Sequence, residues 1–210
     1  MGITILCVLK SGGVYDSTWV DKLKRGVERN LTVPHRFVCL SDVAVDCERI
    51  VMRHDWPGWW AKIGMFEPGL INGKTLYLDL DTIITGNMDA FTDFQNDFAM
   101  LENFNDKTFV GSGMMWFKDK APDGVYERFA WFPQRVMDHY LNVKNGSYMG
   151  DQAFIFDTLD RKIDKISSPA LRSYKKHCRN GLPEGTSIVC FHGRPRPTEI
   201  NPPWLERNWI

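Results

Sequence analysis

The sequence predicts an α/β fold with a mixed, mostly parallel central sheet flanked by helices. The chain opens with an unbroken apolar run, Ile3–Leu9, which is typical of a strand covered on both faces. A helical pattern and two further short apolar runs follow, and this β-α-β-β order indicates a largely parallel sheet. A chain of 210 residues without a repeat or a clear linker fits one domain, so residues 1–210 are expected to form a single unit.

Local patterns define the elements in chain order. Asp16 or Ser17 is expected to cap the first helix, because apolar residues such as Trp19 and Leu23 recur behind them at helical spacing. Gly111 and Gly113 are expected in a loop between two later strands. The remaining strands are expected at residues 36–40, 48–52, 74–84, 98–101, 114–117 and 187–191, and the remaining helices at residues 59–66, 124–141 and 149–159.

Composition and charge exclude several classes of protein. The 26 basic side chains balance the 26 acidic ones, whereas a protein that wraps a nucleic-acid backbone needs a surplus of Lys and Arg, so no nucleic-acid partner is expected. No apolar run approaches the length of about 20 residues that spans a bilayer, so no transmembrane segment is expected. The start of the chain also lacks the basic region of a signal peptide. The five cysteines show no C-x-x-C spacing, and a reducing, cytoplasmic location is expected.

Two aspartates interrupt the apolar stretch at residues 74–84. On an extended strand Asp79 and Asp81 point to the same side, roughly 6.5–7 Å apart. Carboxylates so placed can hold a divalent cation, which also offsets their mutual repulsion. They are expected at the carboxyl end of a strand, where open α/β sheets bind ligands. The alternative interpretation is a solvated loop whose acids merely end the strand.

The motifs around this pair resemble those of a known family. The stretch LYLDLDTII at residues 76–84, followed by NMDAF at residues 87–91, resembles the D-x-D region of GT-A-fold glycosyltransferases. It is most similar to the glycogenin-like family 8 and related bacterial sugar transferases. Four further stretches match in order: AKIGMF at residues 61–66, GSGMMWF at residues 111–117, GDQ at residues 150–152 and FHGRPRP at residues 191–197. The resemblance implies a single GT-A-like, nucleotide-diphospho-sugar transferase domain.

The resemblance also implies roles for individual residues. Asp79, Asp81 and His192 would hold Mn²⁺ or Mg²⁺, and Lys62 would contact the donor diphosphate. Asp151 and Gln152 would act beside the reacting carbon. Further contacts to the donor are expected from Leu80, Ser112 and Gly113. The last motif departs from the family, because Gly193 directly follows His192 and Arg196-Pro197 replaces Lys-Pro-Trp, and the D-Q motif lacks a second Asp.

Several of these residues also have a plain structural interpretation. Lys62 can be a surface lysine on an amphipathic helix, and Asp151 can be a helix N-cap. Arg194, like Arg196, is either a phosphate partner or solvated. Tyr15 and Asp42 follow the first two strands, where Tyr15 is expected to stack on uracil and Asp42 to accept a hydrogen bond from the ribose or base.

Together these residues predict a metal-dependent glycosyltransferase. It would move a sugar from a nucleotide-diphosphate donor, expected to be a UDP-sugar, to an unidentified sugar, lipid or protein acceptor. The family resemblance implies retention of the anomeric configuration, whereas deprotonation of the acceptor by Asp151 would give inversion. Two alternatives remain. One is a haloacid-dehalogenase-type phosphatase, whose motif needs Thr or Val where this chain has Ile83. The other is a non-catalytic nucleotide- or carbohydrate-binding module on the same scaffold.

Overall fold

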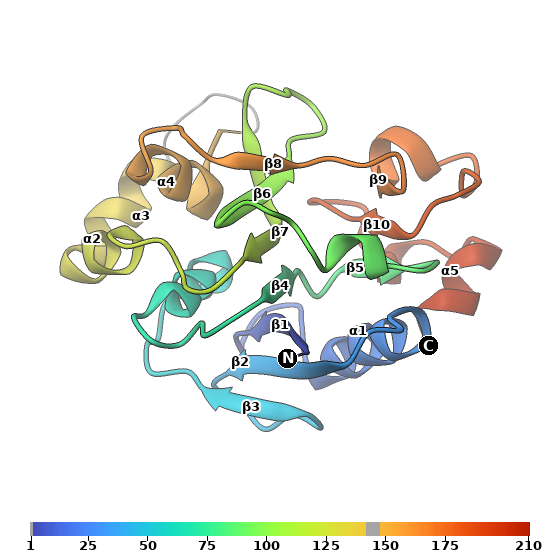
Figure 1. The fold of residues 1–210 in the computed structure, drawn as a ribbon, viewed down its shortest axis with the longest axis horizontal. Helices are drawn as coiled ribbons and strands as arrows, with labels where there is room; N and C mark the ends of the chain where they lie inside the picture. The colour runs from blue at the N-terminus through green and yellow to red at the C-terminus, as the bar shows by residue number, and fades with distance from the viewer. Residues whose placement is uncertain (1, 142–147) are drawn as a thin grey trace.

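The computed structural model describes residues 2–141 and 148–210, and their strands form a seven-stranded sheet and a three-stranded sheet. In the large sheet the order is β3-β2-β1-β4-β7-β6-β8 (Figure 1). The strands of this sheet are β1 (Ile3–Leu9), β2 (His35–Ser41), β3 (Glu48–Val51), β4 (Thr75–Leu78), β6 (Phe98–Glu102), β7 (Val110–Phe117) and β8 (Asp164–Ile166). The first four in chain order run parallel, β7 is antiparallel to both neighbours, and β8 is parallel to β6. The predicted α/β class with a mixed, mostly parallel sheet is therefore confirmed.

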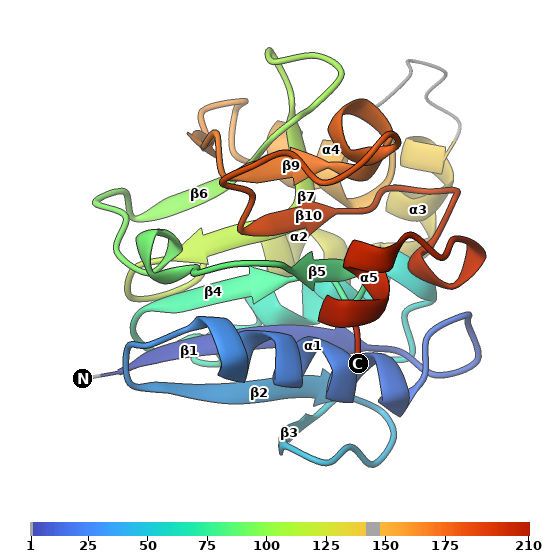
Figure 2. The same ribbon diagram turned by 90° about the vertical axis from the view of Figure 1, so that its right-hand side faces the viewer.

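Two layers cover the large sheet. On one face lie α1 (Ser17–Asn30), α5 (Pro203–Asn208) and the small sheet, whose strands are ordered β5 (Thr82–Ile84), β10 (Ile188–Cys190) and β9 (Leu171–Ser173). On the other face lie the 3-10 helix η1 (Gly58–Phe66) and helices α2 (Val125–Trp131), α3 (Pro133–Leu141) and α4 (Gly150–Thr158). Figure 2 shows the first layer in front of the large sheet. The short helices are η2 (Asp89–Phe91), η3 (Tyr174–Cys178) and η4 (Pro197–Glu199).

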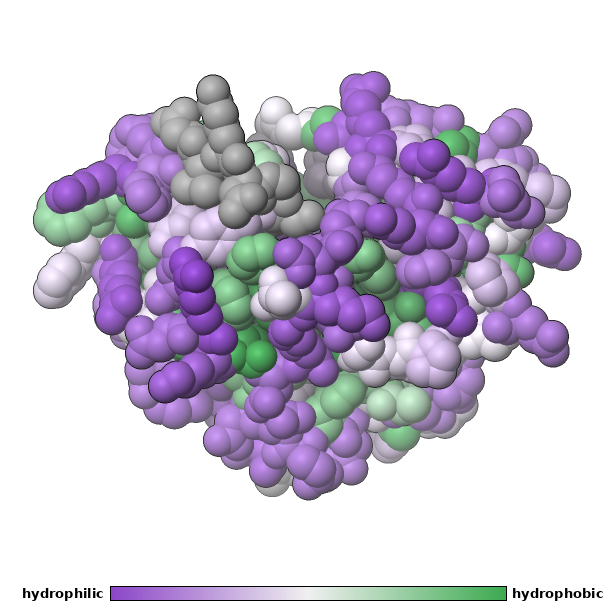
Figure 3. Space-filling view, turned by 90° about the horizontal axis from the view of Figure 1, so that it is seen from above, coloured by the Kyte–Doolittle hydropathy of each residue, from purple (hydrophilic) through white to green (hydrophobic). Residues whose placement is uncertain are grey.

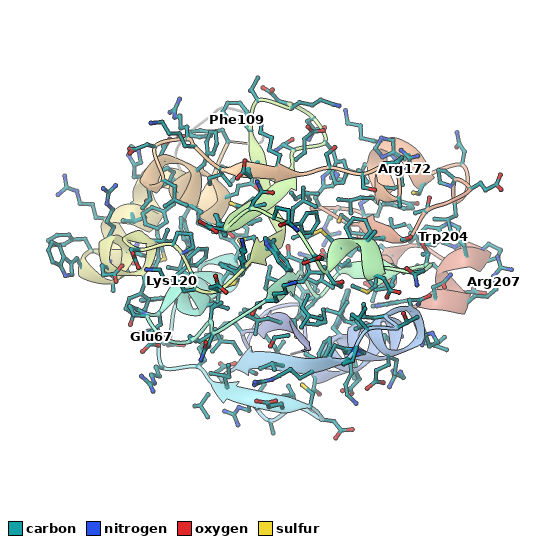
Figure 4. The ribbon with its side chains drawn as sticks, in the orientation of Figure 1. Glu67, Phe109, Lys120, Arg172, Trp204 and Arg207 are labelled. Atoms are coloured by element: carbon teal, nitrogen blue, oxygen red, sulfur yellow. The ribbon has the colours of Figure 1, made fainter. Side chains whose placement is uncertain are left out.

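A hydrophobic core fills the space on each side of the large sheet. Figure 4 draws the side chains on the ribbon. Along β1, Ile5 and Cys7 pack with α1 and the small sheet, whereas Leu6 and Val8 pack with η1, α2 and α4. Successive side chains of a strand point to opposite faces, so a strand with a core on each face must be apolar at every position. This is why the run at Ile3–Leu9 has no polar alternation. On the face drawn in Figure 3, most of the surface outside the grey atoms is hydrophilic.

Helix α1 forms as the sequence predicts. Its apolar positions recur at helical spacing and are buried against the first core. The carboxylate of Asp16 accepts a hydrogen bond from the backbone N–H of Thr18 at 3.0 Å, so Asp16 rather than Ser17 caps the helix.

The expected single strand at residues 74–84 is wrong. Strand β4 ends at Leu78 and β5 begins at Thr82, and the two strands belong to different sheets. Between them, residues 79–81 form a turn closed by a hydrogen bond from the N–H of Thr82 to the carbonyl of Asp79, at 3.0 Å. The positions of Asp79 and Asp81 are therefore set by the turn that carries the chain from one sheet to the other. They are not set by the alternation of side chains along a single strand.

Other expectations need smaller corrections. The helical pattern at residues 124–141 splits into α2 and α3 at Phe132, because the residue before a proline is pushed out of the helical conformation. Gly111 and Gly113 lie within β7 and not in a loop. The helix expected at residues 59–66 is the 3-10 helix η1. The short elements β8, β9 and α5 were not foreseen; Trp204, labelled in Figure 4, anchors α5 to the small sheet.

Two further findings concern the chain as a whole. All five cysteines lie within the described residues, and all are free thiols. In the part of the chain that the structure describes, no helix combines the length and apolar character needed to cross a bilayer.

The aromatic cluster under η1 gives a test of the second core. Phe129 is fully buried and its ring contacts those of Trp56, Trp60 and Phe154. We expect Phe129→Ala to lower the free energy of unfolding by about 3–5 kcal/mol, because it leaves a cavity that the neighbouring rings cannot fill. Phe132→Ala is the matched control, because that side chain is 60% exposed, and we expect about 0.5 kcal/mol or less. Urea denaturation measures both; equal losses would contradict this packing.

Candidate functional site

A cavity of about 950 Å³ opens where β1 and β4 end. The turn at residues 79–81 forms its floor, together with residues 111–113 of β7. Its walls come from both covering layers, with His192 and Arg196 on the side of the small sheet and Trp59 and Asp151 on the side of η1 and α4. The cavity thus joins the two layers at the carboxyl edge of the parallel strands, where open α/β sheets bind ligands.

Most residues that the sequence singled out meet in this cavity. Asp42 and Arg194 are the exceptions, since neither lines it. The predicted residues that do line it are Tyr15, Lys62, Asp79, Leu80, Asp81, Ser112, Gly113, Asp151, Gln152 and His192.

A buried lysine organises the floor of the cavity. The Nζ atom of Lys62 lies 3.1 Å from Oδ1 of Asp79 and 3.1 Å from Oδ2 of Asp151, and it donates a hydrogen bond to Oγ of Ser112 at 3.0 Å. Burial alone would lower the pKa of Lys62, but the charges of Asp151 and Asp79 outweigh it and raise the pKa above its ordinary value. Lys62 is therefore a buried, compensated cation and not a surface lysine.

Asp151 lies in the first turn of α4, beside this lysine. The N-cap position of α4 belongs to Met149, so the interpretation of Asp151 as an N-cap is wrong. Its neighbour Gln152 accepts a hydrogen bond from the backbone N–H of Ser112 at 3.4 Å. These contacts fix the start of α4 against β7 and hold both side chains at the cavity wall.

Asp81 is a buried carboxylate in the same turn. It is 6% exposed, and the hydroxyl of Tyr15 donates a hydrogen bond to it at 2.9 Å. Burial first, and then the charge of Asp79, raise the pKa of Asp81 to about 7. Tyr15 lines the cavity, where its hydroxyl is engaged with Asp81 and its ring packs edge-on against Trp19. Its stacking on a base stays a prediction.

His192 lines the cavity but does not join the two aspartates in a compact group. Its Nε2 lies 2.7 Å from Oγ of Ser173, and its ring stacks on Phe104. Burial and the charges of Lys175 and Lys176 lower the pKa of His192. Within residues 2–141 and 148–210, no three His, Cys, Asp or Glu side chains come close enough together to form a metal-binding group.

The two residues outside the cavity have other partners. The carboxylate of Asp42 binds the loop after β1, through Nζ of Lys10 at 2.5 Å and both the backbone N–H and the hydroxyl of Ser11. Although burial opposes the shift, the hydrogen bonds from Lys10 and Ser11 lower the pKa of Asp42 to about 2. Arg194 does not line the cavity; its exposed side chain pairs with Oε1 of Glu199 at 3.1 Å.

The sequence assigned no definite role to two basic residues that line the cavity on the small-sheet side. Lys175, from η3, and Arg196, just before η4, both line the cavity. Neither forms an ion pair with a carboxylate in the described part of the chain, in contrast to Lys62. The adjacent pair Lys175-Lys176 resembles an ordinary solvated face, so only the fold could place Lys175 here.

Gly150 brings α4 against an indole ring. Its φ is +69°, and a Cβ added there would lie 2.9 Å from Nε1 of Trp59. We expect Gly150→Ala to lower the free energy of unfolding by about 1–2 kcal/mol, because alanine is strained in the left-handed backbone conformation. The displacement of Trp59 by the new Cβ atom should lower the free energy of unfolding further. Gly185→Ala is the control, since Gly185 has a φ of +72° with open space around it. Equal losses in chemical denaturation would show that the ring does not rest on Gly150.

The raised pKa of Asp81 makes stability depend on pH. Its carboxyl holds a proton up to about pH 7 in the folded chain but only to about pH 4 when unfolded, so its ionisation destabilises the folded chain as pH rises between these values. In chelator, we expect Asp81→Asn to stabilise the protein above pH 7 by on the order of 2 kcal/mol and to flatten this pH dependence. Melting curves at several pH values measure it; an unchanged slope would contradict the burial of this charge.

Comparisons with known proteins bear on the fold. No family model matches the chain, and no curated protein matches its sequence. Solved structures do match. The apo form of the glycosyltransferase GlyE from Streptococcus pneumoniae TIGR4 superposes with a TM-score of 0.61 at 12% identity, covering 94% of this chain but 56% of GlyE.

Two other glycosyltransferases match in the same way. The galactosyltransferase LgtC, in complex with donor and acceptor sugar analogues, gives a TM-score of 0.61 at 10% identity and covers 93% of this chain and 89% of LgtC. The bifunctional glycosyltransferase WbbM gives 0.56 at 10% identity, with 93% of this chain and 46% of WbbM covered. The chain therefore spans about half the length of GlyE and WbbM and most of LgtC. At these identities the likeness establishes the fold: the chain has the GT-A-like fold that the sequence predicted.

Proposed function

We propose that the chain is a glycosyltransferase that moves a sugar from a nucleotide-diphosphate donor, a UDP-sugar, to an acceptor hydroxyl. The observation that carries the proposal is the composition of this cavity: two carboxylates at Asp79 and Asp81, the buried cation Lys62, and the cations Lys175 and Arg196, which form no ion pair within the described residues. Such a cavity offers both a cation site and phosphate partners. The fold supports the proposal, since LgtC was solved with donor and acceptor sugar analogues.

The two aspartates fit a divalent cation, Mn²⁺ or Mg²⁺. Carboxylate oxygens are the ligands that such hard cations prefer. Burial and then the charge of Asp79 raise the pKa of Asp81, and a bound cation would offset the repulsion between the two carboxylates. We propose Asp79 and Asp81 as ligands; His192 lines the small-sheet side of the same cavity apart from them and would have to approach them to become the third ligand. When bound, the ion would neutralise charge that develops on the departing diphosphate.

The unpaired cations are the proposed diphosphate partners. Phosphate oxygens form strong, charge-assisted hydrogen bonds with Lys and Arg, and a cation without a carboxylate partner can make them without breaking an ion pair. We therefore assign this role to Lys175 and Arg196 in place of Arg194. Lys62 adds a fixed positive charge at the floor, where the partly enclosed cavity strengthens its field.

Asp151 and Gln152 are the proposed groups beside the reacting carbon. The ion pair with Lys62 fixes Asp151, and the contact with Ser112 orients Gln152. Positioning of this kind lowers a barrier because the groups need not be ordered during the reaction. The resemblance to family 8 favours retention of configuration, which NMR of the product's anomeric proton would report.

A thermal-shift panel tests the function as a whole. It would compare nucleoside diphosphates and nucleotide sugars, each with and without Mn²⁺. A ligand at about 100 times its Kd stabilises the folded chain by about 2.7 kcal/mol, so we expect UDP and at least one UDP-sugar to raise the Tm with Mn²⁺ by about 5–10 °C. If no nucleotide raises the Tm, either with or without Mn²⁺, the proposed function is wrong.

Variants separate the cation site from the phosphate site. We expect Asp81→Ala to remove the Mn²⁺-dependent part of UDP binding, because one of two carboxylates is lost. Lys175→Ala should weaken UDP binding about tenfold or more, with or without Mn²⁺, because it removes a charge-assisted hydrogen bond. Lys176→Ala is the matched control, since its side chain does not line the cavity. Calorimetry measures each Kd; metal-independent, undiminished UDP binding by Asp81→Ala would contradict the proposed site.

A further inference from the structure

Two tyrosine hydroxyls reach the aspartate turn, one for each carboxylate. The hydroxyl of Tyr15 donates a hydrogen bond to Oδ2 of Asp81 at 2.9 Å. The hydroxyl of Tyr77 donates one to Oδ1 of Asp79 at 2.5 Å. Both tyrosines line the cavity beside the two aspartates. The function proposed above uses both carboxylates but neither of these hydroxyls.

Both tyrosine rings are anchored in packed surroundings. Tyr77 lies in β4, is 1% exposed and belongs to the second core. Tyr15 lies in the loop before α1, and its ring packs edge-on against the buried Trp19, with the ring centroids 4.8 Å apart. A hydroxyl on an anchored ring can hold its partner in one position, because packing leaves the ring little freedom to move.

The two carboxylates need such anchors because they lie in a turn and not in a sheet. The outer torsion of an aspartate side chain has no sharp preference, so the carboxylate can rotate unless a neighbour holds it. Each group that must be ordered when a ligand binds lowers the affinity. A carboxylate has about four acceptor positions, so a bond from one hydroxyl leaves other positions for a cation.

We propose that Tyr15 and Tyr77 are positioning residues of the cation site; the inference rests on the proposed function. Their hydroxyls hold the two carboxylates in the orientation in which both face one divalent cation. Hydrogen-bond partners that stand behind the ligands of a metal ion in this way typically contribute about 10–100-fold to its affinity.

The two tyrosines contribute unequally. Lys62 also holds Asp79, with its Nζ atom 3.1 Å from Oδ1. Within residues 2–141 and 148–210, no side chain other than Tyr15 donates a hydrogen bond to Asp81. The orientation of Asp81 therefore depends on its tyrosine more than the orientation of Asp79 does.

Binding of Mn²⁺ tests the proposal without any measurement of sugar transfer. Electron paramagnetic resonance reports the free ion, so a titration of the protein with UDP, against UDP alone as the blank, gives the Kd of Mn²⁺. We expect Tyr15→Phe to raise this Kd about tenfold or more, and Tyr77→Phe to raise it less. A melting curve without metal shows that each variant is folded, and Tyr15→Phe decides if the buried Tyr77→Phe is not.

Tyr140→Phe is the matched control. The hydroxyl of Tyr140 also donates a hydrogen bond to an aspartate, Asp157, at 3.2 Å, but neither residue lines the cavity. The variant loses the same kind of contact away from the cation site, so we expect its Kd for Mn²⁺ to equal that of the unaltered chain.

Binding of UDP separates a positioning role from a structural one. Tyr15→Phe keeps the ring and removes only the hydroxyl, so we expect it to weaken UDP binding with Mn²⁺ far more than without it. If this variant binds Mn²⁺ as tightly as the unaltered chain, or loses UDP binding equally with and without Mn²⁺, the positioning role is wrong and the cation site stands. If the unaltered chain binds no Mn²⁺ beyond the blank, the cation site itself fails and the inference fails with it.

Discussion

The compensated burial of Lys62 is the interaction on which the site depends. An ammonium group taken out of water costs several kcal/mol unless nearby charges and hydrogen bonds replace its hydration. Asp79 comes from the turn after β4, Asp151 from α4 and Ser112 from β7, so one cation ties three segments to η1. Removal of Asp79 or Asp151 would take away one of the charges that compensate the ammonium group, and removal of Ser112 would take away one of its hydrogen bonds. These contacts hold the four segments in one arrangement.

The turn at Asp79 and Asp81 places this network between the two layers. Strand β4 sits in the large sheet and β5 in the small sheet, and the chain changes sheets within residues 79–81. Both carboxylates consequently face a space walled by both layers and not the surface of a single sheet. That position explains how one cavity can carry unpaired cations at one end and an aromatic ring at the other.

The sequence predicted what local patterns determine. The run Ile3–Leu9 and helix α1 followed from apolar spacing, and motif resemblance brought Asp81, Asp151 and His192 to one cavity. It could not show that residues 74–84 divide between two sheets, because one buried strand and two joined by a turn give the same apolar run. The sequence also could not predict that Lys175 lines the cavity, because only tertiary packing brings η3 there.

The contact between Asp42 and the loop after β1 has a consequence for how a ligand enters. Two hydrogen bonds from Ser11 and the charge of Lys10 fasten that loop to the end of β2 before anything is bound. Because the pKa of Asp42 is about 2, its carboxylate stays ionised near neutral pH and keeps these contacts with Lys10 and Ser11. This rim of the cavity is thus preorganised: an incoming ligand does not have to spend its own free energy on ordering it.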